Sequence, residues 1–442
     1  MDNFLHQLKR VIPKPVFRFF QPVYHWLLAF CGAVLYGFPS RGLTIIGVTG
    51  TNGKSTVVEM LHELFSAAGH KTASLSSVRF KIGDKEIENR FKMTMPGRFF
   101  VQKFLADAKK SGATHVILEV TSEGIKQFRH KYINFAAVVL TNLTPEHIEA
   151  HGGFENYKKA KGELFCALRG RGISVVNLDD KNADYFLSFP ARGRIGYSLE
   201  QNQGSRIKGQ GLSRAISPAR YEVNERGITL YFSDGWEVST PLKGKFNAEN
   251  MLAAIAVGEQ FGVSHDVMQK VFAEFHGVPG RMEEIQDGEI RVIVDYAFTP
   301  NALRQVYETL RQGTRNKGQG KLICVFGAAG GGRDKWKRPE LGKIAGEYCD
   351  HVIITNEDPY DENPRQIMED VARGAALRSA PYEIIEDRCL AIRGALEDGR
   401  PGDTVVITGK GCESAIAVAH GKKIPWDDRQ VVREELARLA RL

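Results

Sequence analysis

The chain has 442 residues, of which 43% are hydrophobic and 25% charged, a composition that fits a multidomain enzyme of about three domains with a sizeable core. Its net charge of +8 favours anionic ligands. The basic residues are spread along the chain rather than gathered in one tract, so nucleic acid is not indicated as a partner.

The cysteines predict neither a disulfide framework nor a structural zinc site, because they stand far apart and contain no C-x-x-C pair. The expected compartment is therefore the reducing cytoplasm, where ATP is also found. The six are Cys31, Cys166, Cys324, Cys349, Cys389 and Cys412.

The first forty residues contain an apolar, aromatic run from Val23 to Phe38, preceded by Lys9, Arg10, Lys14 and Arg18. The run is shorter than the roughly twenty residues that a bilayer span requires. Two interpretations remain open. Residues 15–38 form either a helix packed on the catalytic domain or a basic-aromatic element that contacts a membrane surface.

A glycine-rich segment, GVTGTNGKST at 47–56, follows the strand-like run 43–48 and opens a helical pattern. This order of strand, loop and helix surrounds a phosphate with backbone N–H groups and a helix N-terminus. Lys54 then serves as the mobile cation and Ser55 as a magnesium ligand. The alternative is a glycine-rich turn that binds nothing, but such a turn has no need of a lysine followed by two hydroxyls.

Beyond residue 40, strand-like runs alternate with helical patterns, as in parallel α/β layers. Residues 201–214 interrupt this alternation, and 221–240 predict short antiparallel strands turned at Arg226-Gly227 and Asp234-Gly235. A helix is expected over 247–261. The expected strands of the first domain are 43–48, 115–120, 136–141, 173–177 and 194–197.

The segment 277–281, Gly-Val-Pro-Gly-Arg, predicts an interdomain hinge. After it the alternation resumes, with strands expected at 292–295, 322–326, 352–355, 383–385 and 404–408. The predicted fold is therefore α/β: a doubly wound, P-loop central domain over 41–278 and a Rossmann-like C-terminal domain over 279–442, after an N-terminal apolar helical segment at 1–40. The glycines at 327–332 lack the G-x-G-x-x-G spacing, which argues against a redox function.

Chemistry-bearing residues fall at the carboxyl ends of predicted strands, where open α/β sheets bind ligands. Glu119 ends one strand, and the segment 141–147, TNLTPEH, ends the next. A carboxylate and an imidazole so placed are able to hold magnesium beside a γ-phosphate.

Ten motifs in order make the chain resemble the Mur ligase family, and within it most closely the MurE-like branch. They are GVTGTNGKST at 47–56, LEVTSEGIKQFR at 118–129, TNLTPEHIEAHG at 141–152, YKKAKGELF at 157–165, GKFNAENMLAA at 244–254, GVPGRME at 277–283, DYAFTP at 295–300, FGAAGGGRDKWKRP at 326–339, TNEDPYDENP at 355–364 and GKGCE at 409–413.

The resemblance implies an ATP-dependent carboxylate–amine ligase of peptidoglycan precursor synthesis, which adds an amino acid to a peptide acceptor. A carboxylate is a poor electrophile, so the γ-phosphate is first transferred to it, and an amine then displaces phosphate from the acyl phosphate. Because carboxylate and triphosphate are both anions, this step requires lysine, magnesium and a hinge arginine.

The resemblance also implies roles at the ATP end of the site. Ser55, Glu119 and His147 bind two magnesium ions, with Lys161 carried as a carbamate, while Lys54, Glu119, His147, Lys161 and Arg281 are the catalytic set. ATP contacts Gly50, Thr51, Asn52, Gly53, Lys54, Ser55, Thr56, Asn247, Arg281 and Asp295. From the residues alone, Lys161 is an ordinary solvated lysine. The alternative for Arg281 is an ordinary interdomain salt bridge.

At the amine end, the resemblance assigns Arg333 to the incoming carboxylate and Glu413 to its ammonium group. Tyr360 stands where diaminopimelate-adding relatives carry an arginine, which disfavours diaminopimelate. Asp358 is expected to suit a cationic side chain such as lysine. Further departures from the family pattern, all on acceptor-facing or amine-facing surfaces, are Glu123, Glu146, Phe298 and Cys412.

The resemblance begins near residue 41, so the domain with which MurE-like enzymes grip the UDP-sugar is expected to be missing. The acceptor is then held through its peptide by Thr94, Pro96, Arg98, Thr121, Ser122 and Arg129, or it is lipid-linked and brought to the N-terminal segment. The expected location is the cytoplasm, at the inner face of the membrane in the second case. No protein partner is predicted.

Two other enzymes and one other class of protein stay open. A folate-type or polymer-forming glutamate ligase also has no UDP-binding domain. A MurT-like subunit activates a carboxylate for ammonia from a glutaminase, but such proteins carry a four-cysteine zinc insertion that this sequence does not show. A non-catalytic nucleotide-binding scaffold is disfavoured by the intact Lys54, Glu119, His147 and Lys161.

Overall fold

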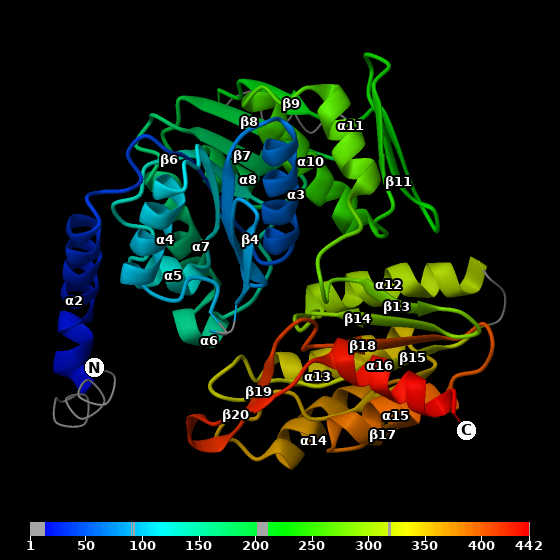
Figure 1. The fold of residues 1–442 in the computed structure, drawn as a ribbon. Helices are drawn as coiled ribbons and strands as arrows, with labels where there is room; N and C mark the ends of the chain where they lie inside the picture. Colours follow the sequence, from blue (N-terminus) through cyan, green and yellow to red (C-terminus); the bar gives the residue numbers. More distant parts are fainter. Residues whose placement is uncertain (1–13, 90, 92, 201–210, 317–319, 442) are drawn as a thin grey trace.

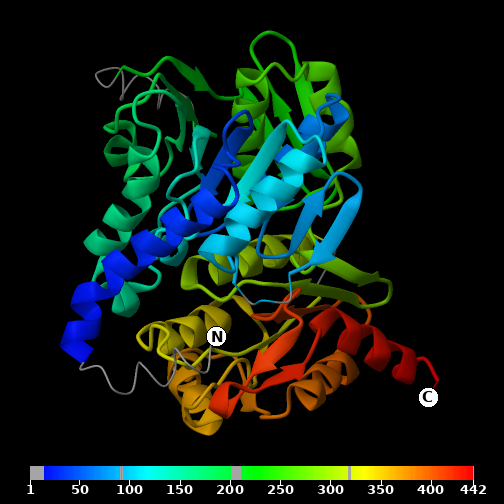
Figure 2. The same cartoon turned by 60° about the vertical axis from the view of Figure 1, so that its left-hand side comes forward.

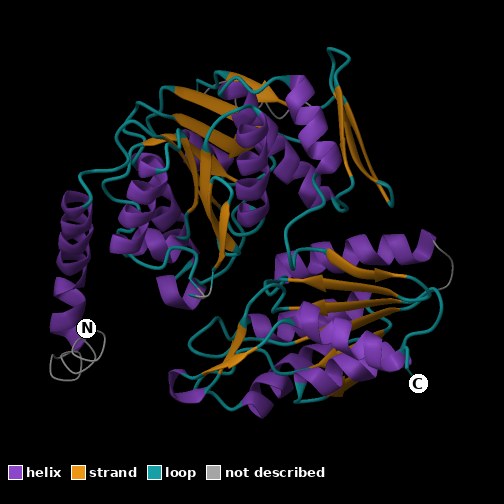
Figure 3. Cartoon of the chain, viewed as in Figure 1, coloured by secondary structure: helices purple, strands orange, loops and turns teal. Residues whose placement is uncertain are grey.

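The computed structural model describes residues 14–89, 91, 93–200, 211–316 and 320–441. They form two α/β units, one above the other in Figure 1, and an N-terminal helix that lies along the side of the upper unit. Both sheets are covered by helices on their two faces (Figure 3), as the predicted alternation of strands and helices requires.

The central sheet has nine strands in the order β4-β3-β2-β5-β1-β6-β7-β8-β9. Its parallel core confirms the five strands expected from apolar runs: β1 (Thr44–Thr49), β5 (His115–Glu119), β6 (Phe135–Leu140), β7 (Ile173–Asn177) and β8 (Gly193–Tyr197). The sequence did not predict the strands that flank this core. They are β2 (Thr72–Leu75), β3 (Arg79–Ile82), β4 (Lys85–Glu88) and β9 (Arg214–Ile216), of which β4 and β9 form the edges.

Alternate residues of β1 enter two separate cores. Ile46 and Val48 pack with α3 (Lys54–Ala67) and α10 (Lys245–Gln260). Ile45 packs with residues of α4 (Arg98–Lys110) and α7 (Phe154–Cys166) on the other face. This alternation fixes the register of the strand and so the position of the glycine loop that follows it. The remaining helices of this unit are α5 (Ser122–Lys126), α6 (Ile148–His151), α8 (Ala183–Leu187) and α11 (His265–Glu274).

A small antiparallel sheet, β10-β11-β12, projects from the central unit (Figure 1). Its strands are β10 (Arg220–Asn224), β11 (Gly227–Tyr231) and β12 (Glu237–Thr240), as the two predicted turns require. Residues 201–210, expected to interrupt the alternation, lie outside the described residues.

The C-terminal sheet has six strands in the order β13-β14-β18-β15-β16-β17. Four neighbouring pairs are parallel, and β13 (Glu283–Asp287) adds an antiparallel edge. The other strands are β14 (Arg291–Asp295), β15 (Leu322–Phe326), β16 (His351–Ile354), β17 (Tyr382–Ile384) and β18 (Thr404–Thr408). The helices are α12 (Pro300–Asn316), α13 (Lys337–Tyr348), α14 (Pro364–Ala375), α15 (Arg388–Asp398) and α16 (Asp428–Leu439). A hairpin of β19 (Ala415–Ala417) and β20 (Lys423–Pro425), joined through η2 (Ala419–Gly421), completes the unit.

The N-terminal helix α2 (Lys14–Leu35) packs on α4 through small residues, and Ala29, Gly32 and Ala33 are buried there. Figure 2 shows the helix crossing the outside of the central unit. Within the described part of the chain, no helix combines the length and apolarity needed to cross a membrane.

The expectation that the cysteines stay unpaired is wrong for one pair. Cys324 in β15 and Cys349, just after α13, form a disulfide with Cα atoms 6.2 Å apart. They are separated by 25 residues along the chain, and only the return of α13 to the sheet brings them together. Spacing along the sequence gives no sign of such a pair.

Candidate active site

One cavity of about 560 Å³ lies between the two α/β units and is lined by both. Its walls come from the loops after β1, β5 and β6 of the central sheet and the loops after β14, β15 and β18 of the C-terminal sheet. The carboxyl ends of two parallel sheets therefore face each other across this space, which is where open α/β sheets place their ligands.

The glycine loop forms the floor of the cavity, and all seven residues from Gly50 to Thr56 line it. Gly50 and Gly53 have φ angles of 149° and 82°. A Cβ atom would lie 1.9 Å from Thr141 Oγ1 at the first position and 2.2 Å from Asn250 Oδ1 at the second. Only glycine allows this close approach, and the loop leads into the N-terminus of α3, so the residues fit a polyphosphate.

Two lysines stand under this loop. The ammonium group of Lys54 donates to Thr51 O at 2.8 Å, and Lys161 Nζ donates to Gly50 O at 2.7 Å. Burial lowers the pKa of Lys54, and burial together with the charge of Lys54 lowers the pKa of Lys161 well below its usual value. Lys161 is 1% exposed, so the view of it as a solvated lysine does not hold.

Glu119, at the end of β5, is the carboxylate beside the loop. It accepts a hydrogen bond from Ser55 Oγ at 2.9 Å and others from the backbone and hydroxyl of Ser77. A hydroxyl and a carboxylate side by side at the first turn of α3 are the oxygen ligands that Mg²⁺ prefers. No sequence motif indicated Ser77, because its contact with Glu119 depends on the path of the loop between β2 and β3.

His147 lines the same cavity and has a φ of 55°, on a loop that the opposite unit holds in place. The carboxylate of Asp334 accepts from the backbone N–H groups of Ile148 and Glu149, at 3.1 and 2.9 Å. Burial and the nearby charge of Arg333 lower the pKa of His147 to about 3, which keeps its imidazole neutral and available to a metal.

The hinge places Arg281 between the units, where its guanidinium donates to Ser55 Oγ at 3.2 Å and lies 4.4 Å from the centre of the Tyr296 ring. Its Nε atom is buried without a hydrogen-bond partner in the described structure. Asp295 also lines the cavity, and burial raises its pKa. Asn247 lines the cavity as well and donates to Lys243 O at 2.9 Å.

Arg333 and Glu413, the residues expected to hold the incoming amino acid, both line the cavity. Tyr296 donates to Glu413 at 2.7 Å, and the buried Lys410 forms an ion pair with the same carboxylate. Asp358 accepts from Lys410 at 2.9 Å and does not line the cavity. Its carboxylate is therefore engaged inside the protein, and its geometry gives no support to contact with a substrate side chain.

Tyr360, beside these residues, also stays outside the cavity lining. It has a φ of 52° and is hydrogen-bonded through its backbone to Ala417. The phenol interacts with the Arg333 guanidinium, whose pKa is raised by Tyr360 and Tyr296 against the effect of burial. Tyr360 thus acts next to the residue expected to hold the amino-acid carboxylate.

On the acceptor side, the cavity is lined by Thr94, Thr121, Ser122 and Arg129. Arg129 Nε is buried without a hydrogen-bond partner in the described structure. Arg98 lies outside the lining, and it donates to Gln127 O at 2.8 Å and contacts His25 of α2. Burial and the charge of Arg129 lower the pKa of Arg98 to about 10, so the two cations are close together.

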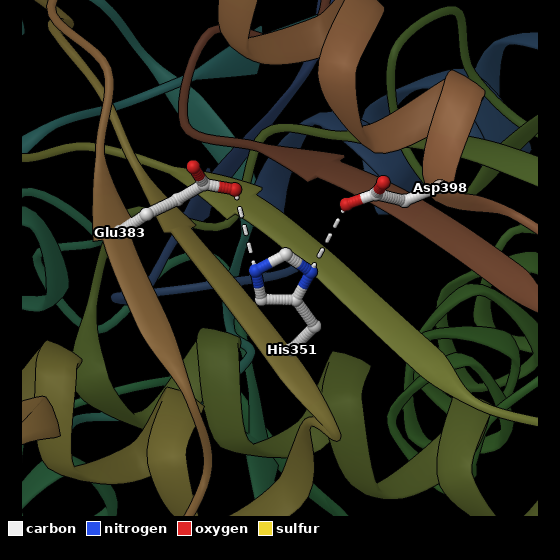
Figure 4. Close-up of side chains that lie close together, drawn as sticks. All are labelled: His351, Glu383 and Asp398. Carbon is white, nitrogen blue, oxygen red and sulfur yellow. Dashed lines mark ion pairs between the residues drawn. The ribbon is translucent and has the colours of Figure 1, made fainter.

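A second group of titratable residues lies at the opposite edge of the C-terminal sheet, where β16 begins (Figure 4). His351 Nε2 is 3.3 Å from Glu383, and Nδ1 is 3.4 Å from Asp398. The three side chains each bring a possible ligand atom within 4.8 Å of the others, but exposed acidic groups of this kind are common without a metal. None of the three lines the cavity between the two units.

Comparison with known proteins matches residues 48–258 to the Mur ligase middle domain and residues 280–411 to the Mur ligase glutamate ligase domain. The UDP-N-acetylmuramoyl-L-alanyl-D-glutamate–2,6-diaminopimelate ligase of Synechococcus elongatus is 37% identical over 410 residues, 92% of this chain and 79% of that protein. A solved structure of an enzyme with the same name is 32% identical, with a TM-score of 0.59 over 90% of this chain and 79% of the other.

A folylpolyglutamate synthase of Mycobacterium tuberculosis shares the fold, with a TM-score of 0.63 over 88% of this chain and 93% of the other, at 17% identity. That likeness extends to the fold alone.

Proposed function

The chain belongs to the Mur ligase family and is a MurE-type ATP-dependent peptide ligase of peptidoglycan precursor synthesis; from this premise we propose roles for its residues and a preferred amino acid. The observation that carries the proposal is that one cavity joins the glycine loop to Arg333 and Glu413 of the opposite unit. The phosphate-donor site and the amine site then share one cavity.

ATP binds with its phosphates on the loop from Gly50 to Thr56 and with Lys54 beside them. Asn247 contacts the adenine and Asp295 the ribose. Both residues line the cavity on the side of the hinge, which supports this assignment. Arg281 already spans the two units through Ser55, and its buried Nε–H is available to donate a hydrogen bond to an anionic partner.

Ser55, Glu119 and His147 are the residues that hold magnesium. When bound, magnesium neutralises the phosphate charge that otherwise repels the incoming carboxylate. Lys54 and Arg281 add fixed positive charge around the same point. Closure of the two units around the site would keep water from the acyl phosphate until the amine attacks.

Lys161 carries a carbamate in this account. Its amine is buried and has a pKa well below the usual value, which favours the neutral, nucleophilic form over that of an exposed lysine. The nitrogen of this neutral amine forms a bond to carbon dioxide and releases a proton, which leaves an anion beside Lys54. Labelling with ¹³C-bicarbonate tests this: a carbamate signal is expected in the native chain and not in Lys161→Ala, and its absence from the native chain contradicts the assignment.

The amino acid is one without a second carboxylate, and lysine is the candidate. The support comes from Tyr360, which stands at the position of the relatives' arginine and offers a phenol in place of a guanidinium. Arg333 holds the α-carboxylate and Glu413 the ammonium group. Asp358 takes part indirectly, since its bond to Lys410 fixes the lysine that pairs with Glu413.

The acceptor is a peptide that ends in a carboxylate, for which the muramoyl-alanyl-glutamate of the relatives is the model. Thr94, Thr121, Ser122 and Arg129 line its side of the cavity. The unpaired Nε of Arg129 and the neighbouring Arg98 provide the positive charge for its anionic groups.

ADP release with this acceptor tests the proposal when lysine, diaminopimelate, glutamate and ammonium are compared and the product mass is measured. Lysine-dependent release with an acceptor-plus-lysine product is expected. Diaminopimelate as the preferred substrate overturns the amino-acid assignment alone. If no acid–amine pair supports ADP release, or if phosphate is transferred to a hydroxyl, the proposed ligase roles are wrong.

A further inference from the structure

The N-terminal helix α2 exposes an unusual amount of apolar surface. From Gln21 to Leu35 it contains no charged side chain. The residues that turn toward the protein are small, and a Cβ at Gly32 would lie 3.6 Å from Phe99 and Gln102 of α4. This narrow contact leaves most of the helix circumference uncovered.

Over residues 20–35, most of the large apolar side chains of α2 lie on the uncovered part, whereas Leu28 is half-buried. Six of them are between 39% and 67% exposed: Val23, Trp26, Leu27, Phe30, Val34 and Leu35. Trp26 and Phe30 stack with ring centroids 5.9 Å apart, and Phe30 is 5.6 Å from Tyr132 in the adjoining loop. A helix that is apolar on this much of its surface is normally covered.

The charge balance of this part of the sequence indicates the occupant of the exposed face. Residues 1–41 contain Lys9, Arg10, Lys14, Arg18 and Arg41 but a single acidic residue, Asp2. Residues 1–13 lie outside the described part of the chain, so their charges are known from the sequence alone. A basic segment beside exposed tryptophan, tyrosine and phenylalanine is typical of an element that lies in the headgroup region of an anionic bilayer.

The helix also touches the acceptor side of the active site. His25 contacts Arg98, and Arg98 in turn donates to the backbone of Gln127, a residue that lines the cavity. The loop that follows contains Arg129, which lines the cavity, and Tyr132, which packs on Phe30. A surface that covers α2 therefore lies beside the acceptor entrance, the part of the cavity lined by Gln127 and Arg129.

We propose that the exposed face of α2, formed by Val23, Trp26, Leu27, Phe30, Val34 and Leu35, binds the surface of an anionic phospholipid bilayer and holds the acceptor entrance against it. The second clause rests on the proposed function and implies an acceptor carried by a membrane lipid. The first clause is independent of catalysis. The helix lies on the bilayer, since it lacks the length and apolarity for a span.

Vesicle flotation of the full chain tests the binding. Phosphatidylcholine vesicles containing phosphatidylglycerol are compared with phosphatidylcholine alone, at low and high salt. The native chain is expected to float with the anionic vesicles and to be released by salt. Trp26→Ser/Phe30→Ser is expected to reduce the bound fraction by about tenfold or more, because two exposed aromatic side chains that would enter the bilayer surface are lost.

Leu377→Ser/Leu390→Ser is the matched control, since these two leucines are 72% and 49% exposed on the C-terminal unit. This variant is expected to float like the native chain, and both variants are expected to release ADP at the native rate with a water-soluble acceptor. If the native chain and the Leu377→Ser/Leu390→Ser control both float but neither releases ADP, the proposed function is wrong and the membrane inference still holds.

Three outcomes overturn the inference: no flotation with anionic vesicles at low salt, equal flotation of the Trp26→Ser/Phe30→Ser variant, or equal binding to phosphatidylcholine alone. A concentration-dependent dimer in sedimentation velocity that the same variant abolishes also overturns it, because a second copy then covers the helix.

Discussion

The ammonium group of Lys337 lies 3.1 Å from Glu146 Oε1, and both side chains are almost fully buried at the junction of the two α/β units. Glu146 stands on the loop after β6, next to His147, while Lys337 opens α13 of the C-terminal unit. With the nearby bonds from Asp334, this pair attaches the predicted metal-binding loop to the segment that carries the predicted amino-acid ligand Arg333.

Replacing Lys337 with Met is expected to lower the thermal unfolding midpoint, because it leaves a buried carboxylate without its cation. Breaking such a pair costs about 3–5 kcal/mol. Burial already raises the pKa of Glu146, and its Oε2 has no partner in the described structure. The Glu146→Leu/Lys337→Met double variant is expected to recover most of the midpoint. A double variant as unstable as the single one contradicts the pairing.

Replacing Asp334 with Ala removes the acceptor for two backbone N–H groups beside His147. Turnover is expected to fall by about tenfold or more, since small misplacements of a catalytic loop reduce rates strongly, while ADP affinity in calorimetry stays unchanged. Asp361→Ala is the control, because Asp361 accepts from His420 N within the C-terminal unit alone. Equal losses of turnover in the two variants would remove the special role of Asp334.

Gly53→Ala is expected to weaken ATP binding by at least about tenfold. The added Cβ meets Asn250 Oδ1 at 2.2 Å, and the Asn250 amide is held by Asn247 Oδ1 at 3.1 Å, so it has little room to move. Gly394→Ala is the control. Gly394 lies in helix α15, where an added Cβ would be 3.9 Å from Ile385 Cδ1, and alanine there is expected to stabilise by up to about 1 kcal/mol. Native ATP affinity in Gly53→Ala would contradict the phosphate-loop assignment.

The parallel core was predictable because buried parallel strands are continuous apolar runs, as in β1, β15 and β18. Edge strands give no such signal. All residues of β4, Lys-Glu-Ile-Glu, are exposed, and β13, Glu-Glu-Ile-Gln-Asp, is only half-buried. These strands form because a neighbouring strand offers hydrogen-bond partners, a fact that depends on the tertiary fold.

The site residues also fall into two groups, those that local sequence predicts and those that depend on the tertiary fold. The glycine loop was predictable from ten consecutive residues, since its chemistry is local. The contact of Lys337 with Glu146 joins residues 191 apart, and Ser77 reaches Glu119 across 42. Asp358 shows the converse: its charge was visible in the sequence, but the buried Lys410 that occupies it was not assigned. Pairing across such separations follows only from the packed sheets.

Tyr360→Arg is expected to raise diaminopimelate-dependent ADP release relative to lysine-dependent release by about tenfold, because a guanidinium is able to bind a second carboxylate with two hydrogen bonds. Tyr382→Arg is the control, since that tyrosine is exposed on β17 away from the cavity. An unchanged substrate ratio in Tyr360→Arg would show that the residue at this position does not select the amino acid.

Glu249→Gln is expected to stabilise the protein at pH 8 and to have no effect at pH 4. Burial, followed by the charge of Asp179, raises the pKa of Glu249 from 4.5 to about 7. Between these values the folded state keeps a proton that the unfolded state has released, so stability falls as pH rises through this window. Above it, the folded state holds a buried carboxylate at a cost of about 3 kcal/mol.

Glutamine avoids that cost at every pH, so the gain in thermal midpoint of Glu249→Gln over the native chain is expected to grow from pH 4.5 to 7 and then level off. Glu274→Gln, at an exposed position at the end of α11, is expected to show no such trend. A gain that is constant with pH would mean that Glu249 is already charged in the folded state at pH 5, held by Lys245, the cation that lowers its pKa.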